Sequence, residues 1–379
     1  MLFSEVLGLD HIKNHLITGV ENGRIPHAQL LVGQGVLPIA IAYAQYLLCS
    51  NKDGENTGGN ESCNLKFNKL SHPDLHFVYP VATNDKIKSH PVSAHFSEEW
   101  RQFVLSNPYG SVFEWLQSLG IENKQGNISV DEAQDIVKAL SLKAYEGGHK
   151  VMIIWMAEKM NTSSANKLLK LIEEPPDKTV FLLIAEDEEQ LLTTITSRCQ
   201  IIRIPLLSEE VIAQGLIGRE NAPYDLAKEA ARQASGSFNK ALQLYKNKSE
   251  DNQFETWVIF WVRTAFRAKG NKTVINELIN WSEEIAGSGR EVQKKFLDYC
   301  TSFFRQALLI NYNASPLVYL KIKDPKFALE KFAPFIHGGN VMEIVEAIED
   351  ANYHIERNGN AKIIFTDLSI QLTRLLHKK

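Results

Sequence analysis

The sequence predicts an α/β domain followed by all-α domains, and three observations carry this prediction. Apolar runs of the kind that form strands buried on both faces occur at residues 151–156, 180–185 and 201–204. Helical patterns alternate with these runs, which is typical of a parallel sheet covered by helices on both faces. After Pro205 no strand pattern follows, and helical patterns rich in Phe, Leu and Ile extend to the C-terminus.

Length and composition indicate a soluble chain of several domains. A length of 379 residues favours two or three domains over a single core. Apolar residues make up 44% of the chain and charged residues 23%, as in ordinary globular proteins. The formal charge of −4 argues against nucleic-acid binding through overall charge, so any such contact needs a local patch or a partner. Because Glu5 lies near the start and no apolar run reaches about 18 residues, we expect no secretory signal, no membrane contact and a cytoplasmic location.

The predicted helices of the α/β domain carry start and stop signals. In the first 25 residues Asp10 is a candidate N-cap, and apolar residues recur on one helical face at a spacing of four: Ile12, Leu16 and Val20. Ser129 and Glu132 fit a capping box ahead of another apolar helical face. A helix over residues 163–173 is stopped by Pro175 and Pro176.

A strand, a glycine turn and a helix follow one another near the N-terminus. The apolar run at residues 29–32 is followed by Gly33-Gln34-Gly35 and then by an apolar helix at residues 39–48. Phosphate-binding α/β folds begin in this order. Residues 50–62 are polar and glycine-rich, which predicts a loop, and residues 72–128 follow no pattern that assigns them to elements.

Three short stretches carry a resemblance to a known family. They read Gly-Arg-Ile-Pro-His-Ala at residues 23–28, Asn-Lys-Leu-Leu-Lys-Leu-Ile-Glu-Glu-Pro-Pro at 166–176 and Thr-Ile-Thr-Ser-Arg-Cys at 194–199. In this order they resemble the clamp-loader branch of the AAA+ proteins, and within it the bacterial delta-prime subunits of DNA polymerase III. The resemblance covers roughly residues 1–245. The last third is matched only in being helical, as the family's oligomerising collar is.

The resemblance implies a division into three domains. Residues 1–206 would form the AAA+ parallel-sheet domain with a degenerate nucleotide site, residues 207–247 a helical lid and residues 253–379 a helical collar that joins subunits. Within the lid, Lys240 stands near the position of the family's usual arginine, and we expect it to be structural.

Arg198 is the candidate catalytic residue, with Ser197 and Cys199 as its flanking motif. The resemblance implies that this arginine projects into the ATP site of an adjacent subunit. A guanidinium suits that task because it is planar, always charged and able to contact several phosphate oxygens. A lone arginine between a helix and a strand is more often a surface residue, but the surrounding string favours the finger. Cys199 is expected to pack rather than to react.

The glycine turn lacks the residues of a working phosphate loop. Such a loop needs a lysine for the phosphates and a Ser or Thr for magnesium. Gly33 and Gly35 are present, but Leu37 and Pro38 stand where the lysine and the hydroxyl belong. We therefore predict a degenerate site that binds and hydrolyses no ATP.

The end of the strand at residues 151–156 agrees with this prediction. The resemblance implies acidic residues there in hydrolysing members, whereas this chain has Trp155, Met156, Ala157 and Glu158. Glu158 also occurs in inactive members and does not restore the site. We expect Trp155 and Met156 to fill the space of a nucleotide. On the helix at 163–173, Lys167 and Lys170 fit a solvated surface and a subunit interface equally well.

The cysteines leave a zinc question open. Four cysteines in so long a chain do not predict a disulfide framework. Delta-prime relatives commonly carry a four-cysteine zinc knuckle after the first helix, and this chain keeps only Cys49 and Cys63, followed by His72 and His76. A mixed Cys/His site can be drawn, but no Cys-x-x-Cys pair supports it. We expect a degenerate knuckle closed by other packing, with neither zinc nor ATP as a cofactor.

The leading hypothesis is a non-hydrolysing clamp-loader subunit that donates an arginine in trans. Its partners would be ATP-hydrolysing tau/gamma-type motor subunits and a delta subunit in a hetero-pentamer that loads a sliding clamp on primed DNA. The isolated chain would be no enzyme, but a subunit of a DNA-directed DNA polymerase holoenzyme. Two alternatives are an ATP-binding motor subunit of the same branch and a stand-alone AAA+-derived regulator of DNA replication.

Overall fold

The computed structural model describes most of the chain. The described residues are 1–50, 61–121, 124–145, 148–246, 250–268, 271–320 and 322–378. The loop predicted at residues 50–62 falls almost wholly outside them. The described residues form two compact units, Met1–Gln243 and Leu244–Lys379. The division into three domains stays a prediction.

A parallel sheet lies at the centre of the first unit. Its strands are β1 (Ala28–Val32), β2 (Leu75–Val78), β3 (Lys150–Trp155), β4 (Thr179–Ala185) and β5 (Gln200–Arg203). Within the described residues they form a five-stranded sheet in the order β2-β3-β4-β1-β5, with every neighbouring pair parallel. The predicted fold class, α/β followed by all-α, is confirmed. Of these strands, only β2 was not assigned from the sequence.

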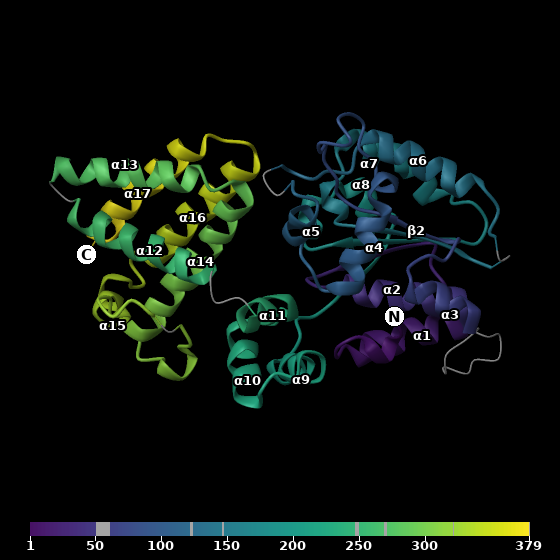
Figure 1. Cartoon of the computed structure of the whole chain (residues 1–379), viewed down its shortest axis with the longest axis horizontal. Coiled ribbons are helices and arrows are strands. Elements are labelled where there is room, and N and C mark those ends of the chain that lie inside the picture. The colour runs from purple at the N-terminus through teal and green to yellow at the C-terminus, as the bar shows by residue number, and fades with distance from the viewer. Residues whose placement is uncertain are drawn as a thin grey trace. The chain divides into compact units, whose positions relative to one another are not determined.

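Helices cover both faces of this sheet (Figure 1). Because successive strand residues point to opposite faces, Ile153 packs in one core and Ile154 in the other. The first core is closed by α1 (Asp10–Glu21), α2 (Leu37–Cys49), α4 (Ser97–Ser106) and α5 (Val112–Ser118). The second core is closed by α6 (Val130–Ser141) and α7 (Thr162–Glu173). Burial on both faces explains why these strands read as continuous apolar runs.

Short helices complete the first unit. Beside α3 (Glu61–Asn68) and α8 (Thr193–Thr196), a helical segment follows β5, made of α9 (Glu209–Glu220), α10 (Tyr224–Gln233) and α11 (Phe238–Lys246). We call α9 to α11 the lid. Ser208 begins it, because its hydroxyl accepts a hydrogen bond from the Val211 amide at 3.3 Å.

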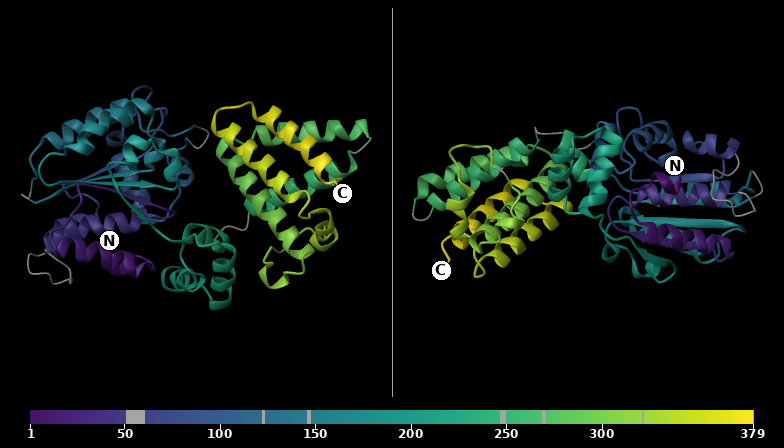
Figure 2. Two further views of the ribbon diagram at one scale, coloured as in Figure 1. Left: turned by 180° about the vertical axis from the view of Figure 1, so that it is seen from behind. Right: turned by 90° about the horizontal axis from the view of Figure 1, so that it is seen from below.

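The second unit consists of helices and the loops between them, with no strand among its described residues (Figure 2). Its helices are α12 (Glu250–Arg267), α13 (Lys272–Ala286), α14 (Arg290–Asn311), α15 (Leu329–Phe332), α16 (Val341–Glu356) and α17 (Ala361–Leu375). Aromatic side chains dominate its core. The stacked rings of Trp261 and Trp281 lie 5.2 Å apart, and Phe296 and Phe365 pack against Trp281. This unit therefore has a core of its own.

Two predicted helix starts are wrong in detail. Asp10 is the first residue of α1 rather than its cap, since Leu9 precedes the helix in a left-handed conformation. Ser129 does precede α6, but its hydroxyl is buried and has no hydrogen-bond partner among the described residues. Glu132 accepts instead from the Ser93 amide at 2.6 Å. The segment around Ser93 thus takes the carboxylate that a capping box would have used.

Candidate functional site

Arg198 lies in a tight turn between a short helix and the start of the edge strand β5. The helix α8 ends at Thr196, and the Arg198 amide donates to the Ile195 carbonyl at 3.1 Å. β5 begins two residues later, at Gln200. The turn formed by Ser197, Arg198 and Cys199 therefore sits at the N-terminal end of β5, and we call it the arginine turn.

The Arg198 side chain is held by its own chain along one edge. Its Nε donates to a carboxylate oxygen of Glu173, the last residue of α7. Its Nη1 donates to the Thr194 carbonyl at 2.9 Å and to the Ser197 hydroxyl at 3.3 Å. These bonds use all the N–H groups of Nε and Nη1, while Nη2 makes no hydrogen bond within the described part of the chain. The side chain is 35% exposed.

Glu173 joins the two most specific strings of the sequence. It belongs to the Leu-Leu-Lys-x-x-Glu-Glu-Pro stretch, and its carboxylate meets the arginine of Ser-Arg-Cys. Both partners are partly exposed, with 43% of the Glu173 side chain accessible. An exposed ion pair adds little to stability. Its evident effect is to fix the direction of the guanidinium. The role of Glu173 was missed from the sequence because its distance from Arg198 along the chain hides the contact.

Cys199 is a poor nucleophile in this setting. Burial raises the pKa of its thiol to about 11, so the thiol stays protonated near neutral pH. It packs at the margin of the core beneath α7.

The glycine turn after β1 lies at the opposite end of the strands from the arginine turn. β1 and β5 are parallel neighbours with Gln29 opposite Gln200 and Val32 opposite Arg203. Gly33 follows the C-terminal end of β1, whereas Arg198 precedes the N-terminal end of β5. The two turns are thus separated by the length of a four-residue strand, roughly 13 Å. Arg198 is not placed to serve the glycine turn of its own chain.

Glycine is required at both ends of this turn. A Cβ on Gly33 would lie 2.8 Å from the Ile204 carbonyl oxygen, and Gly35 has a φ of +64°. The next residues begin α2. Leu37 and Pro38, which stand in place of the lysine and the hydroxyl, are both buried in the core. Apolar side chains thus follow the glycine turn where a working phosphate loop has a lysine and a hydroxyl, and that the turn is a degenerate phosphate loop stays a prediction.

Apolar packing also surrounds the end of β3. Trp155 and Met156 are each 4% exposed, and the Trp155 ring lies 5.0 Å from that of Trp100 and 6.3 Å from that of Phe103. Trp100 and Phe103 belong to α4, in the stretch that no sequence pattern assigned. That Trp155 and Met156 take the space of a nucleotide stays a prediction. Tyr109, which the sequence did not indicate, lies beside Gly35 of the glycine turn.

Glu158 is a buried carboxyl beside this packing. Its Oε1 accepts a hydrogen bond from the Glu186 amide at 3.0 Å, and its Oε2 is buried with no partner among the described residues. Burial raises its pKa to about 7. The group is therefore substantially protonated near neutral pH, which suits a closed site better than one that binds a metal ion.

The two cysteines of the predicted knuckle form a disulfide. Cys49 and Cys63 are joined, with their Cα atoms 5.5 Å apart, a pairing that the sequence did not predict. His72 packs against the Phe67 ring and accepts from the Asp74 amide at 3.1 Å. In the described ranges, no three His, Cys, Asp or Glu residues gather in a way that could hold a metal ion. The residues between the cysteines, 51–60, lie outside those ranges.

The lysines that the sequence analysis singled out are exposed. Lys167 and Lys170 are exposed on α7, and Lys240 is exposed on α11. Of the helices that the structure describes, none has the length and apolar character needed to cross a bilayer.

Sheet order, glycine turn and lid together define a class of protein. A parallel sheet in the order β2-β3-β4-β1-β5, with a phosphate-loop backbone after β1 and a helical lid after β5, is the AAA+ architecture. Comparison with known proteins narrows this class. The family model described as DNA polymerase III, delta subunit, matches residues 8–208, more than half of the chain.

Individual relatives agree with the family match. A DNA polymerase III subunit delta' of Haemophilus influenzae is 29% identical over 184 residues, 48% of this chain and 43% of the relative. A tau/gamma subunit of the same organism is 32% identical over 250 residues, 64% of this chain and 30% of the relative. A gamma subunit-related protein of Thermotoga maritima, a solved structure, has 14% identity and a TM-score of 0.37 over 96% of this chain and 100% of its own. That structural score is too low to carry an argument.

The chain belongs to the delta-prime family of bacterial DNA polymerase III clamp-loader subunits. The predicted family is confirmed. The chain spans about half the length of the curated relatives it matches.

Proposed function

We propose that this chain is a clamp-loader subunit that hydrolyses no ATP itself and donates Arg198 to the ATP site of a neighbouring subunit. In this proposal it assembles with tau/gamma-type motor subunits and a delta subunit, and the hetero-pentamer loads a sliding clamp on primed DNA. Family membership supports the clamp-loader setting. The arginine turn supports the donation of Arg198, and the glycine turn supports the absence of hydrolysis.

The single observation that carries the proposal is the orientation of Arg198. Three N–H groups of its guanidinium are bound within the chain, and the two on Nη2 are left for another molecule. The glycine turn of the same chain is at the other end of the strands. This arrangement supports a phosphate bound by a different subunit as the partner of Nη2.

Phosphoryl transfer explains what such an arginine would do. Negative charge on the transferred phosphoryl group and the leaving oxygens is stabilised by a fixed cation, which costs no reorganisation at the moment of reaction. Glu173, Thr194 and Ser197 supply that fixation here. The finger would act on a nucleotide that the motor subunit binds with its own phosphate loop and magnesium.

The decisive experiment compares Arg198→Ala with wild type in a reconstituted assembly. We expect single-turnover hydrolysis at the neighbouring ATP site to fall by at least about a hundredfold, with the assembly intact on size exclusion. Arg198→Lys should recover little, because an ammonium lacks the planar fork. Arg203→Ala is the matched control, since Arg203 is an exposed, ion-paired arginine of β5. Unchanged turnover in Arg198→Ala would show that the finger is elsewhere.

A nucleotide titration of the isolated chain tests the other half of the proposal. We expect no saturable ATP binding in the micromolar range, with or without magnesium. Micromolar affinity would favour a motor subunit over a non-hydrolysing one.

A further inference from the structure

A short segment between α4 and α5 reaches the glycine turn. The segment runs from the end of α4 at Ser106 to the start of α5 at Val112. Tyr109 lies in it and is only 5% exposed. A Cβ built on Gly35 would lie 3.3 Å from Cδ1 of the Tyr109 ring. The edge of the ring therefore lies beside the turn, close enough that a side chain at position 35 would press against it.

The other side of the Tyr109 ring meets the lid. The Phe238 ring, at the start of α11, packs against it edge-on with centroids 5.0 Å apart. The Arg219 guanidinium, on α9, lies over the ring at 5.2 Å from its centroid. A cation over an aromatic face is an attractive arrangement, and it is stronger where water is excluded. One tyrosine thus contacts the glycine turn and two helices of the lid.

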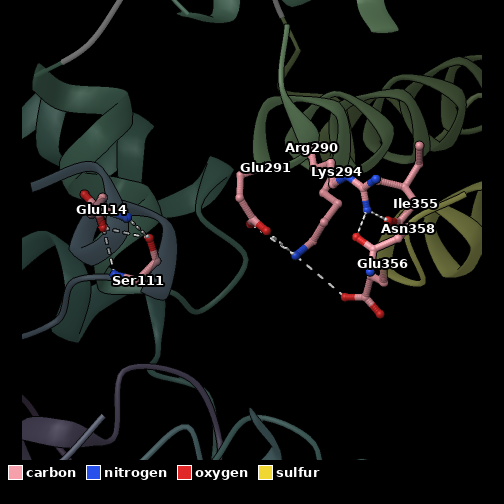
Figure 3. A network of polar contacts seen from close by, with 8 residues as sticks. All are labelled: Ser111, Glu114, Arg290, Glu291, Lys294, Ile355, Glu356 and Asn358. Atoms are coloured by element: carbon pink, nitrogen blue, oxygen red, sulfur yellow. Dashed lines mark hydrogen bonds and ion pairs between the residues drawn. The ribbon is translucent and has the colours of Figure 1, made fainter. Parts of the chain in front are cut away.

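Hydrogen bonds fix the ring and its segment in this place. The Tyr109 hydroxyl accepts from the Leu7 amide at 2.9 Å. Glu114 links the same segment to the lid, because its carboxylate accepts from the Asn239 side-chain amide at 2.7 Å. That carboxylate also accepts from the Ser111 amide at 2.8 Å in a capping box, which holds it in one rotamer (Figure 3).

We propose that Tyr109, which lies between the glycine turn and the lid, ties the lid to the α/β sheet in the absence of nucleotide. A ligand on this turn would place its phosphates against the backbone of residues 33–35, where the tyrosine ring already makes contact. The lid then has a fixed position set by the chain itself. This inference rests on the proposed absence of nucleotide binding, and it does not depend on the role of Arg198.

Close packing around Gly215 also holds the lid in place. A Cβ on Gly215 of α9 would lie 2.8 Å from both a Leu7 methyl group and the Phe238 ring. Leu7 and Phe238 therefore pack directly on the α9 backbone. Tyr109 contacts both residues, through the hydrogen bond from the Leu7 amide and the ring contact with Phe238. Removing the Tyr109 ring should therefore loosen the packing of Leu7 and Phe238 on α9.

Hydrogen exchange of the full chain tests the proposal. In Tyr109→Ala we expect the amides of α9 and α10 to exchange at least about tenfold faster, while those of β3 and β4 keep their wild-type rates. Tyr109→Phe keeps the ring and should stay within about threefold of wild type. Tyr145→Ala is the matched control, because the Tyr145 side chain is 80% exposed.

Chemical rescue and a second variant sharpen the test. Millimolar p-cresol, which replaces the lost ring, should slow lid exchange in Tyr109→Ala and leave wild type unchanged. Arg219→Gln, at an exposed position, should speed exchange in α9 by about threefold. Wild-type lid exchange in Tyr109→Ala, or equal acceleration of lid and central strands, would overturn the proposal. The role of Arg198 is measured by ATP turnover in an assembly, and the role of Tyr109 by hydrogen exchange of the chain. Failure of one test therefore leaves the other proposal standing.

Discussion

The glycine turn and the arginine turn lie at opposite ends of neighbouring strands and differ in every property that matters for a ligand. Around the glycine turn, Leu37, Pro38 and Trp155 are buried, and a tyrosine ring contacts the backbone. At the arginine turn, the guanidinium of Arg198 is partly exposed and keeps one nitrogen unused within the described residues. Buried apolar side chains lie at one end of the sheet, and a partly exposed arginine lies at the other.

Under the proposed function, the difference corresponds to a fold that no longer hydrolyses ATP but still supplies an arginine to a neighbour. Empty space inside a protein is costly, so a site without a ligand is stable only when side chains fill it. A residue that acts on another molecule cannot be packed away, and must be oriented at the surface by polar contacts. Glu173, Thr194 and Ser197 do this for Arg198.

The pH dependence of stability tests whether the glycine-turn end is truly closed. Burial raises the pKa of Glu158 from 4.5 to about 7, so the folded chain holds this proton more tightly than the unfolded chain. Between pH 5 and 8 stability must therefore fall as pH rises, by roughly 2 kcal/mol from this group. Urea unfolding at several pH values measures this slope.

Glu158→Gln supplies the comparison for that slope. An amide does not titrate, so the variant should be more stable than wild type at pH 8 and should lose part of the pH dependence. Burial raises the pKa of Glu132 to about 7 as well, and its share remains in both proteins. Equal slopes in wild type and Glu158→Gln would mean that Glu158 is solvated and that this end of the sheet is open.

The sheet could be predicted from the sequence because its strands are buried on both faces. Residues 151–156, 180–185 and 201–204 were identified within a residue or two of β3, β4 and β5. β2 was missed, since its four residues include His76 and lack a continuous apolar run. The stretch around it is packed through aromatic contacts, such as the stacked rings of Tyr79 and Trp100 at 4.0 Å, which leave no period in the sequence.

The candidate site was predicted only where it consists of a contiguous string. Arg198 and the altered glycine turn could be identified from neighbouring residues. Tyr109 and Glu173 could not, because each acts across a large separation along the chain: Tyr109 binds the Leu7 amide, and Glu173 binds Arg198. Contacts of this kind depend on which elements the fold brings together, and single-sequence patterns do not encode them.

Removing the Glu173 carboxylate, which accepts a hydrogen bond from Arg198, tests how the arginine is oriented. Glu173→Ala should lower single-turnover hydrolysis at the neighbouring site by about tenfold without changing KM for ATP, because the guanidinium loses its Nε acceptor and its fixed direction. Glu173→Gln keeps an acceptor oxygen and should retain most of the rate. Glu188→Ala, which removes the partner of Arg203, is the control. Wild-type turnover in Glu173→Ala would mean that the contacts with Thr194 and Ser197 are enough to orient Arg198.

The smallest expected effect concerns the contact between the glycine turn and Tyr109. Gly23 and Gly35 have the same φ of +64°, but a Cβ on Gly23 would meet nothing within 4 Å, whereas one on Gly35 would meet the tyrosine ring. Alanine at either position carries a similar backbone cost of about 1 kcal/mol. We expect Gly35→Ala to lower the free energy of unfolding by a further few tenths of a kcal/mol, because the ring must shift. The excess should vanish in a Tyr109→Ala background, and a double-mutant cycle measures it. Equal costs at both glycines in the Tyr109 protein would show that the ring yields freely, and the turn would then be less tightly closed than its geometry indicates.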